Sequence, residues 1–123
     1  MLNFAKLETT LDKLNKMSEF FRLTGSTFFT KKLGMDIDLF VEYSDELVKK
    51  LILIGFDSIS RSKYGDSNCQ AVMRYHADLL NPQIDIQLVK DVLLKERVQL
   101  KLEEVGLTHP TKEQWNMGFL FCK

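Results

Sequence analysis

Apolar residues recur along the chain at two spacings, one typical of helices and one typical of strands. Leu7, Leu11 and Leu14 stand at i, i+4 and i+7, which predicts an amphipathic helix over about residues 3–18. Residues 36–43, DIDLFVEY, alternate instead between an apolar face and a face that carries two aspartates. The chain is therefore expected to combine helices with a sheet.

Capping residues and breakers delimit the other elements. One helix is expected between Ser44, a good N-cap, and Gly55, a residue type common just after a helix. The remaining expected strands are residues 20–24, 56–62, 69–77 and 83–89, and the remaining expected helices are a short one within 27–34, a long charged one at 90–105 and a short one after Thr111. This order predicts an α/β or α+β fold in one domain, residues 1–123: a mixed, partly antiparallel sheet of about four to five strands flanked by helices.

Composition changes this picture little. Hydrophobic residues make up 45% and charged residues 28%, and 17 basic residues balance 17 acidic ones, so there is no general attraction to nucleic acid or to an anionic membrane. Cys69 and Cys122 form neither a disulfide framework nor a metal-ligand pattern. No signal-peptide core and no apolar run of the ~18 residues needed to cross a bilayer is found. We expect a cytoplasmic protein without a membrane partner.

The candidate chemistry begins with three carboxylates. Asp36 and Asp38 lie at i and i+2 of one expected strand, so both project from the same face, and Asp85 lies in a second apolar strand, QIDIQLV. If these two strands are neighbours, three carboxylates converge and repel one another unless cations neutralise them. Hard oxygen ligands of this kind suit Mg²⁺, and a shared carboxylate can bridge two ions around a nucleoside triphosphate.

A Gly-Ser pair precedes the acidic strand. Gly25 lets the backbone approach a phosphate closely, and Ser26 offers a hydroxyl and a backbone N–H. Together with the carboxylates, the pair predicts a site for a triphosphate and its metal ions.

The segments GSTFFTKKLGMDIDLFV and IDIQLV together resemble the nucleotidyltransferase superfamily of DNA polymerase β type, in its minimal form. That family's pattern is Gly-Ser, roughly ten residues, an acid–hydrophobic–acid strand and a third acid on a later strand. The resemblance implies that Gly25 and Ser26 bind the triphosphate, and that Asp36, Asp38 and Asp85 bind Mg²⁺ or Mn²⁺. It also implies a nucleotidyltransferase fold and transfer of a nucleoside monophosphate from an NTP, with ATP as the expected donor, to a hydroxyl acceptor.

Several alternatives stay open. An Asp-x-Asp pair on a strand is more often a solvated face than a metal site. Arg61, Lys63 and Arg74 either reach a triphosphate or lie as solvated strand ends. The acceptor is an RNA, a protein or a small molecule, and the chain acts alone, as a homodimer or with a partner protein. Many enzymes of the family carry a second domain, whereas only residues 90–123 follow the strand of Asp85. The alternative function is therefore a non-catalytic or antitoxin-like interaction module that keeps the fold and works with a partner chain.

Overall fold

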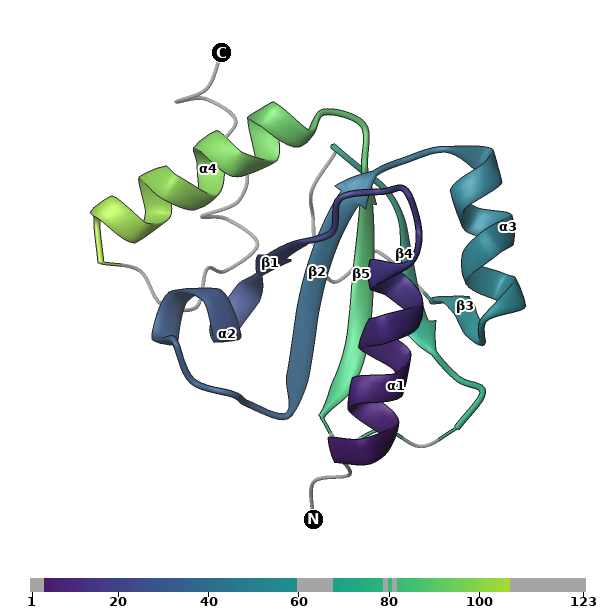
Figure 1. The fold of residues 1–123 in the computed structure, drawn as a ribbon. Coiled ribbons are helices and arrows are strands. Elements are labelled where there is room, and N and C mark those ends of the chain that lie inside the picture. The colour runs from purple at the N-terminus through teal and green to yellow at the C-terminus, as the bar shows by residue number, and fades with distance from the viewer. Residues whose placement is uncertain (1–3, 60–67, 79, 81, 107–123) are drawn as a thin grey trace.

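The computed structural model describes residues 4–59, 68–78, 80 and 82–106. Within them, the chain forms helices and strands in mixed order (Figure 1), with the bounds α1 Phe4–Asn15, β1 Arg22–Thr24, α2 Gly25–Thr30, β2 Asp36–Glu42, α3 Asp45–Leu53, β3 Phe56–Ile59, β4 Cys69–Tyr75, β5 Gln83–Val89 and α4 Val92–Glu104. None of the described helices is long and apolar enough to span a membrane.

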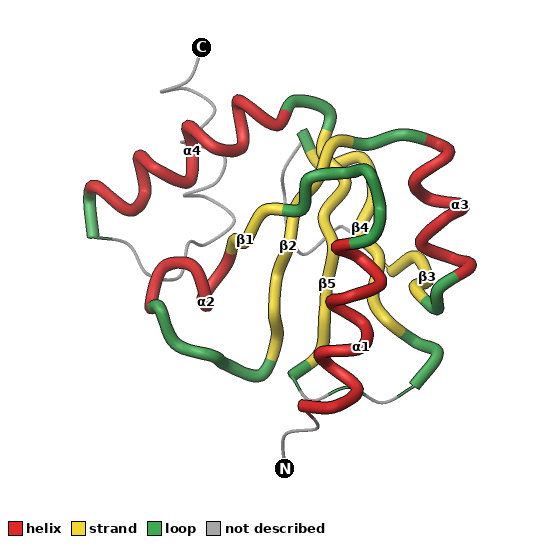
Figure 2. The backbone as a smooth tube through the Cα atoms, viewed as in Figure 1, coloured by secondary structure: helices red, strands yellow, loops and turns green. Residues whose placement is uncertain are grey.

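The described strands form one five-stranded sheet in the order β1-β2-β5-β4-β3. β2 and β5 are parallel, and the other neighbouring pairs are antiparallel. Figure 2 shows these strands at the centre of the molecule, with helices on either side. The predicted α+β fold with a mixed, partly antiparallel sheet is confirmed.

One face of the sheet carries the main hydrophobic core. The buried members of this core come from α1, α3, four of the strands and the connection between β4 and β5: Leu7, Leu14, Ile37, Leu39, Val41, Leu47, Leu51, Phe56, Met73, Tyr75, Leu80, Ile84, Ile86 and Leu88. The alternation read in residues 36–43 is confirmed, since Ile37, Leu39 and Val41 are buried together on this face. Burial of these apolar side chains is the dominant stabilising contribution to the fold.

The opposite face is covered by α4. The Lys95 ammonium on this helix donates to Gln87 Oε1 on β5 at 2.9 Å and lies 5.9 Å from the centre of the Phe40 ring on β2. In Figure 1, α4 and α2 lie together at the β1 side of the molecule. They share a second, smaller apolar cluster of Phe29, Val98 and Leu102. Lys95 and Gln99 are buried, so the interpretation of residues 90–104 as simply an exposed amphipathic helix is wrong.

Element ends agree with the capping signals. The Ser44 hydroxyl accepts a hydrogen bond from Leu47 N at 3.1 Å, and Gly55 follows α3 with φ +107°, a conformation that favours glycine. The short helix expected within 27–34 begins earlier, at Gly25, because the strand ends at Thr24 and Gly25 turns the chain with φ +69°. The helix expected after Thr111 lies outside the described residues, and so do the side chains of Arg61, Lys63 and Cys122. The other cysteine, Cys69, is buried.

Candidate functional site

A polar row crosses the sheet on the face that α4 partly covers. The register aligns one residue from each strand, in the order Thr24, Asp38, Asp85, Arg74 and Asp57. Side chains that are directly opposite one another in a sheet project from the same face and contact their neighbours. The strands of Asp38 and Asp85 are therefore neighbours, and these two carboxylates stand side by side.

Exposure differs among the three predicted metal ligands. Asp36 is exposed at the first residue of β2, Asp38 is half-buried, and Asp85 has only 1% of its surface accessible. Asp36 lies opposite Gln83 rather than opposite an acid. The sheet thus pairs Asp38 with Asp85, while Asp36 lies one pleat period away, about 7 Å along β2.

The Gly-Ser turn lies against the acidic strand. A Cβ atom at Gly25 would lie 2.5 Å from Asp38 Oδ2, 3.0 Å from Asp38 Cβ and 3.1 Å from Asp38 Cγ. Only glycine fits this approach, and its positive φ also favours glycine. The first residue of α2 and the middle of β2, which the rest of α2 and its following loop separate in the sequence, therefore meet at the Asp38 carboxylate.

The next two residues also face the start of β2. The Thr27 hydroxyl donates to the Asp36 carbonyl oxygen at 3.3 Å. A Cβ atom at Gly34 would lie 3.8 Å from Ser26 Oγ, so the loop that enters β2 returns past the Ser26 hydroxyl. One end of β2 thus brings together the Gly-Ser pair and the two acids of the strand: Gly25, Ser26, Asp36 and Asp38.

Asp85 is held by an arginine on the next strand. Arg74 Nε donates to Asp85 Oδ1 at 2.7 Å, and one terminal guanidinium nitrogen donates to Oδ2 at 2.9 Å. This two-pronged geometry is the strongest form of arginine–carboxylate pairing. Arg74 therefore fits neither of the two alternatives, a solvated strand end or a residue that only reaches a triphosphate. Its pairing with Asp85 is not among the sequence-based predictions. The signal that points to it is the cross-strand register of opposite charges on β4 and β5.

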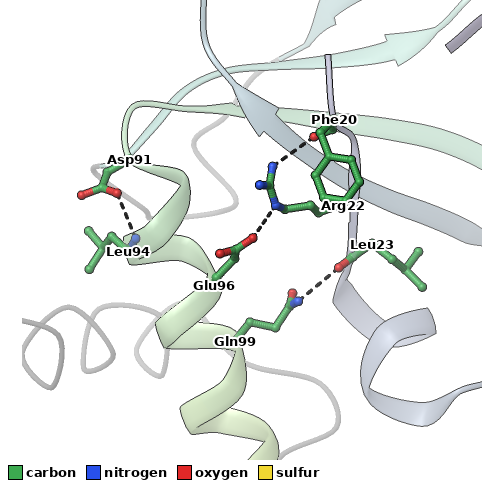
Figure 3. Close-up of polar contacts among 7 residues, drawn as sticks. All are labelled: Phe20, Arg22, Leu23, Asp91, Leu94, Glu96 and Gln99. Carbon is green, nitrogen blue, oxygen red and sulfur yellow. Dashed lines mark hydrogen bonds and ion pairs between the residues drawn. The ribbon is translucent and has the colours of Figure 1, made fainter. Parts of the chain in front are cut away.

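Further contacts tie α4 to β1, the strand that leads into Gly25 (Figure 3). Arg22 forms an ion pair with Glu96, and Gln99 Nε2 donates to the Leu23 carbonyl oxygen at 3.1 Å. Asp91 caps the helix by accepting from Leu94 N at 3.0 Å. Together with the apolar cluster of Phe29, these contacts fix the position of the Gly-Ser turn relative to the sheet.

The donor set fits a hard divalent cation in its chemistry, because carboxylate oxygens are the ligands that Mg²⁺ prefers. The Asp38 carboxylate itself lies against Gly25, where the side chain of any other residue would overlap it. Among the described residues, however, no three side chains of the His, Cys, Asp and Glu types are grouped closely enough to hold a metal ion. The metal-binding roles of Asp36, Asp38 and Asp85, and the phosphate-binding roles of Gly25 and Ser26, stay predictions.

Comparison with known proteins adds no relative: no family model, no curated protein and no solved structure matches this chain.

Proposed function

We propose that this chain is a nucleotidyltransferase that moves a nucleoside monophosphate from an NTP to a hydroxyl acceptor. The observation that supports it best is the environment of Asp38. Its carboxylate stands beside Asp85 on the parallel neighbour strand and against the bare Cα of Gly25. The three motifs of the proposed family pattern, far apart in sequence, are thus adjacent in space.

Each residue in this proposal has a stated task. Asp36, Asp38 and Asp85 are the carboxylates that would hold Mg²⁺ or Mn²⁺, which when bound neutralises charge on the reacting phosphate oxygens. Gly25 is assigned to the close approach of a phosphate to the backbone, and Ser26 would offer its hydroxyl and backbone N–H to it. Asp85 is also the carboxylate assigned to accept the proton of the acceptor hydroxyl.

The donor is an NTP, with ATP as the first to be tested. The acceptor belongs to one of three classes, an RNA, a protein or a small molecule. A homodimer or a partner protein is the proposed source of any acceptor-binding surface that these residues do not provide.

Thermal unfolding tests the proposal. Mg²⁺ or Mn²⁺ together with a triphosphate raises the melting temperature of the wild type, because a ligand that binds only the folded state stabilises it. Asp38→Asn abolishes this rise, whereas Asp12→Asn, which removes one exposed carboxylate on α1, leaves it unchanged. An unchanged melting temperature with all four common NTPs and both metals would refute nucleotide binding. Incubation with NTPs labelled at the α-phosphate then identifies the acceptor from the molecule that retains the label.

A second candidate function is an interaction module that works with a partner chain. It is favoured by the outer face of α4, where Leu93 and Leu100, two turns apart, are 67% and 55% exposed. Isolated apolar residues on a surface are common, but two on one helix face are a feature of docking surfaces. Covalent transfer of labelled nucleotide by the isolated chain would count against this second function.

A further inference from the structure

The feature that the proposed chemistry does not use is the ion pair between Arg74 and Asp85. We propose that the Arg74 guanidinium is an internal counter-cation that occupies Asp85 until a divalent cation binds between Asp38 and Asp85. Binding of the divalent cation and pairing of Arg74 with Asp85 then oppose each other. This inference rests on the proposed function of the site.

The first argument is burial. The Asp85 side chain is 1% exposed, and both of its oxygens accept from Arg74, at 2.7 and 2.9 Å. A buried carboxylate without a cation is strongly unfavourable. A cation is therefore required beside Asp85, and in the absence of a metal ion it has to come from the protein. Arg74 provides one, and its side chain is 31% exposed, so its outer side reaches solvent.

The second argument is the order of charges along the polar row. Asp38 and Asp85 are adjacent, Arg74 follows on β4, and Asp57 lies opposite Arg74 on the edge strand β3. In the register of the sheet Arg74 thus stands between two acidic residues, one buried and one exposed. A divalent cation that takes the oxygens of Asp85 leaves Arg74 beside Asp57, so no charge is left without a neighbour of opposite sign.

The third argument is repulsion. A divalent cation between Asp38 and Asp85 would lie within one or two strand spacings, about 5–10 Å, of the guanidinium. Repulsion between a single and a double positive charge at this range weakens metal affinity at least about tenfold, which is the effect in surroundings as polar as water. Arg74 is therefore expected to weaken cation binding while stabilising the cation-free protein.

Removal of the guanidinium tests the inference without any measurement of activity. Wild type, Arg74→Gln and Arg97→Gln, which removes an equal charge from the exposed face of α4, are titrated with MnCl₂ alone. Bound Mn²⁺ is measured by electron paramagnetic resonance, and the melting temperature is recorded with and without the metal. We expect Arg74→Gln to melt lower than wild type without metal, to bind Mn²⁺ at least about tenfold more tightly and to gain a larger rise in melting temperature.

A double variant separates the cation site from general charge effects. Arg74→Gln with Asp85→Asn replaces the ion pair by two neutral amides, and we expect the gain in Mn²⁺ affinity to disappear because the second carboxylate is lost. Persistence of the gain in the double variant would overturn the proposal, because the effect would not pass through Asp85.

The remaining outcomes are also decisive. If Arg74→Gln binds Mn²⁺ no more tightly than wild type, and Arg97→Gln binds it as wild type does, Arg74 only supports the fold or the geometry of Asp85. The inference about Arg74 is then refuted, while the proposed function is not. An Arg74→Gln protein that stays unfolded even in millimolar Mn²⁺ also refutes it, because the metal then does not replace the guanidinium. A lack of Mn²⁺ binding by every variant and by wild type would instead refute the proposed function itself.

Discussion

Replacement of Gly25 by alanine tests the contact on which the candidate site depends. Gly25 adopts φ +69°, and a Cβ atom there would lie 2.5 Å from Asp38 Oδ2. The positive φ costs a residue with a side chain about 1–2 kcal/mol. The overlap costs about 1–3 kcal/mol more, because Asp38 Cβ and Cγ, at 3.0 and 3.1 Å, are also too close and the whole side chain has to move.

Gly106 is the matched control. It has a similar φ of +76°, but a Cβ atom there would meet no atom of the described residues within 4 Å. Gly106→Ala therefore reports the backbone cost alone, about 1–2 kcal/mol. The difference between the two variants isolates the overlap with Asp38.

Urea denaturation gives the two free energies of unfolding, and thermal melting with Mn²⁺ and ATP gives the ligand response. We expect Gly25→Ala to lose about 2–5 kcal/mol in total and to lose the ligand-induced rise in melting temperature, because the displaced carboxylate is an assigned metal ligand. In an Asp38→Ala background the cost of Gly25→Ala should fall, since the clashing Oδ2 and Cγ atoms are absent. Equal stability of Gly25→Ala and Gly106→Ala would refute the close approach of the turn to Asp38.

Two further predictions concern the surroundings of the site. Phe29→Ala removes the aromatic member of the small cluster with Val98 and Leu102, and is expected to cost about 2–4 kcal/mol in urea denaturation; a loss below about 1 kcal/mol would contradict the role of this cluster in joining α2 to α4. The Tyr43 hydroxyl donates to Asp45 Oδ1 at 2.6 Å, and this hydrogen bond raises the pKa of Tyr43 above 10.0. A raised pKa means that the bond stabilises the fold below about pH 10 and that this stabilisation is lost as the pH rises through the folded-state value, so wild type and Tyr43→Phe should differ in unfolding free energy at neutral pH and converge in strong alkali.

Local signals in the sequence were sufficient for most of the secondary structure. The alternation of Ile37, Leu39 and Val41 and the cap at Ser44 report interactions between near neighbours in the chain, and both are confirmed. The sequence predicts that α2 starts at residue 27, two residues later than its observed start at Gly25. The observed start depends on the turn at Gly25, where the chain passes the Asp38 carboxylate.

The burial of α4 was not predictable in the same way. Residues 90–105 are rich in charge, so the pattern favours an exposed amphipathic helix. Lys95 and Gln99 are nevertheless buried, since the sheet beneath them presents polar partners: Gln87 accepts from Lys95, and the Leu23 carbonyl accepts from Gln99. Periodicity records which residues are apolar, and it carries no information on whether a polar side chain finds a partner elsewhere in the chain.

For the candidate site, the sequence by itself determined the ingredients: a Gly-Ser pair, two acids at i and i+2 of one strand, and a third acid on a second apolar strand. Only the tertiary structure decided their neighbours. Parallel pairing of β2 with β5 sets Asp38 beside Asp85, the turn at Gly25 sets the backbone against Asp38, and antiparallel pairing with β4 sets Arg74 on Asp85. The physical reason is that strand register depends on burial over the whole sheet, and a shift of one strand by one residue would move all of its side chains to the other face.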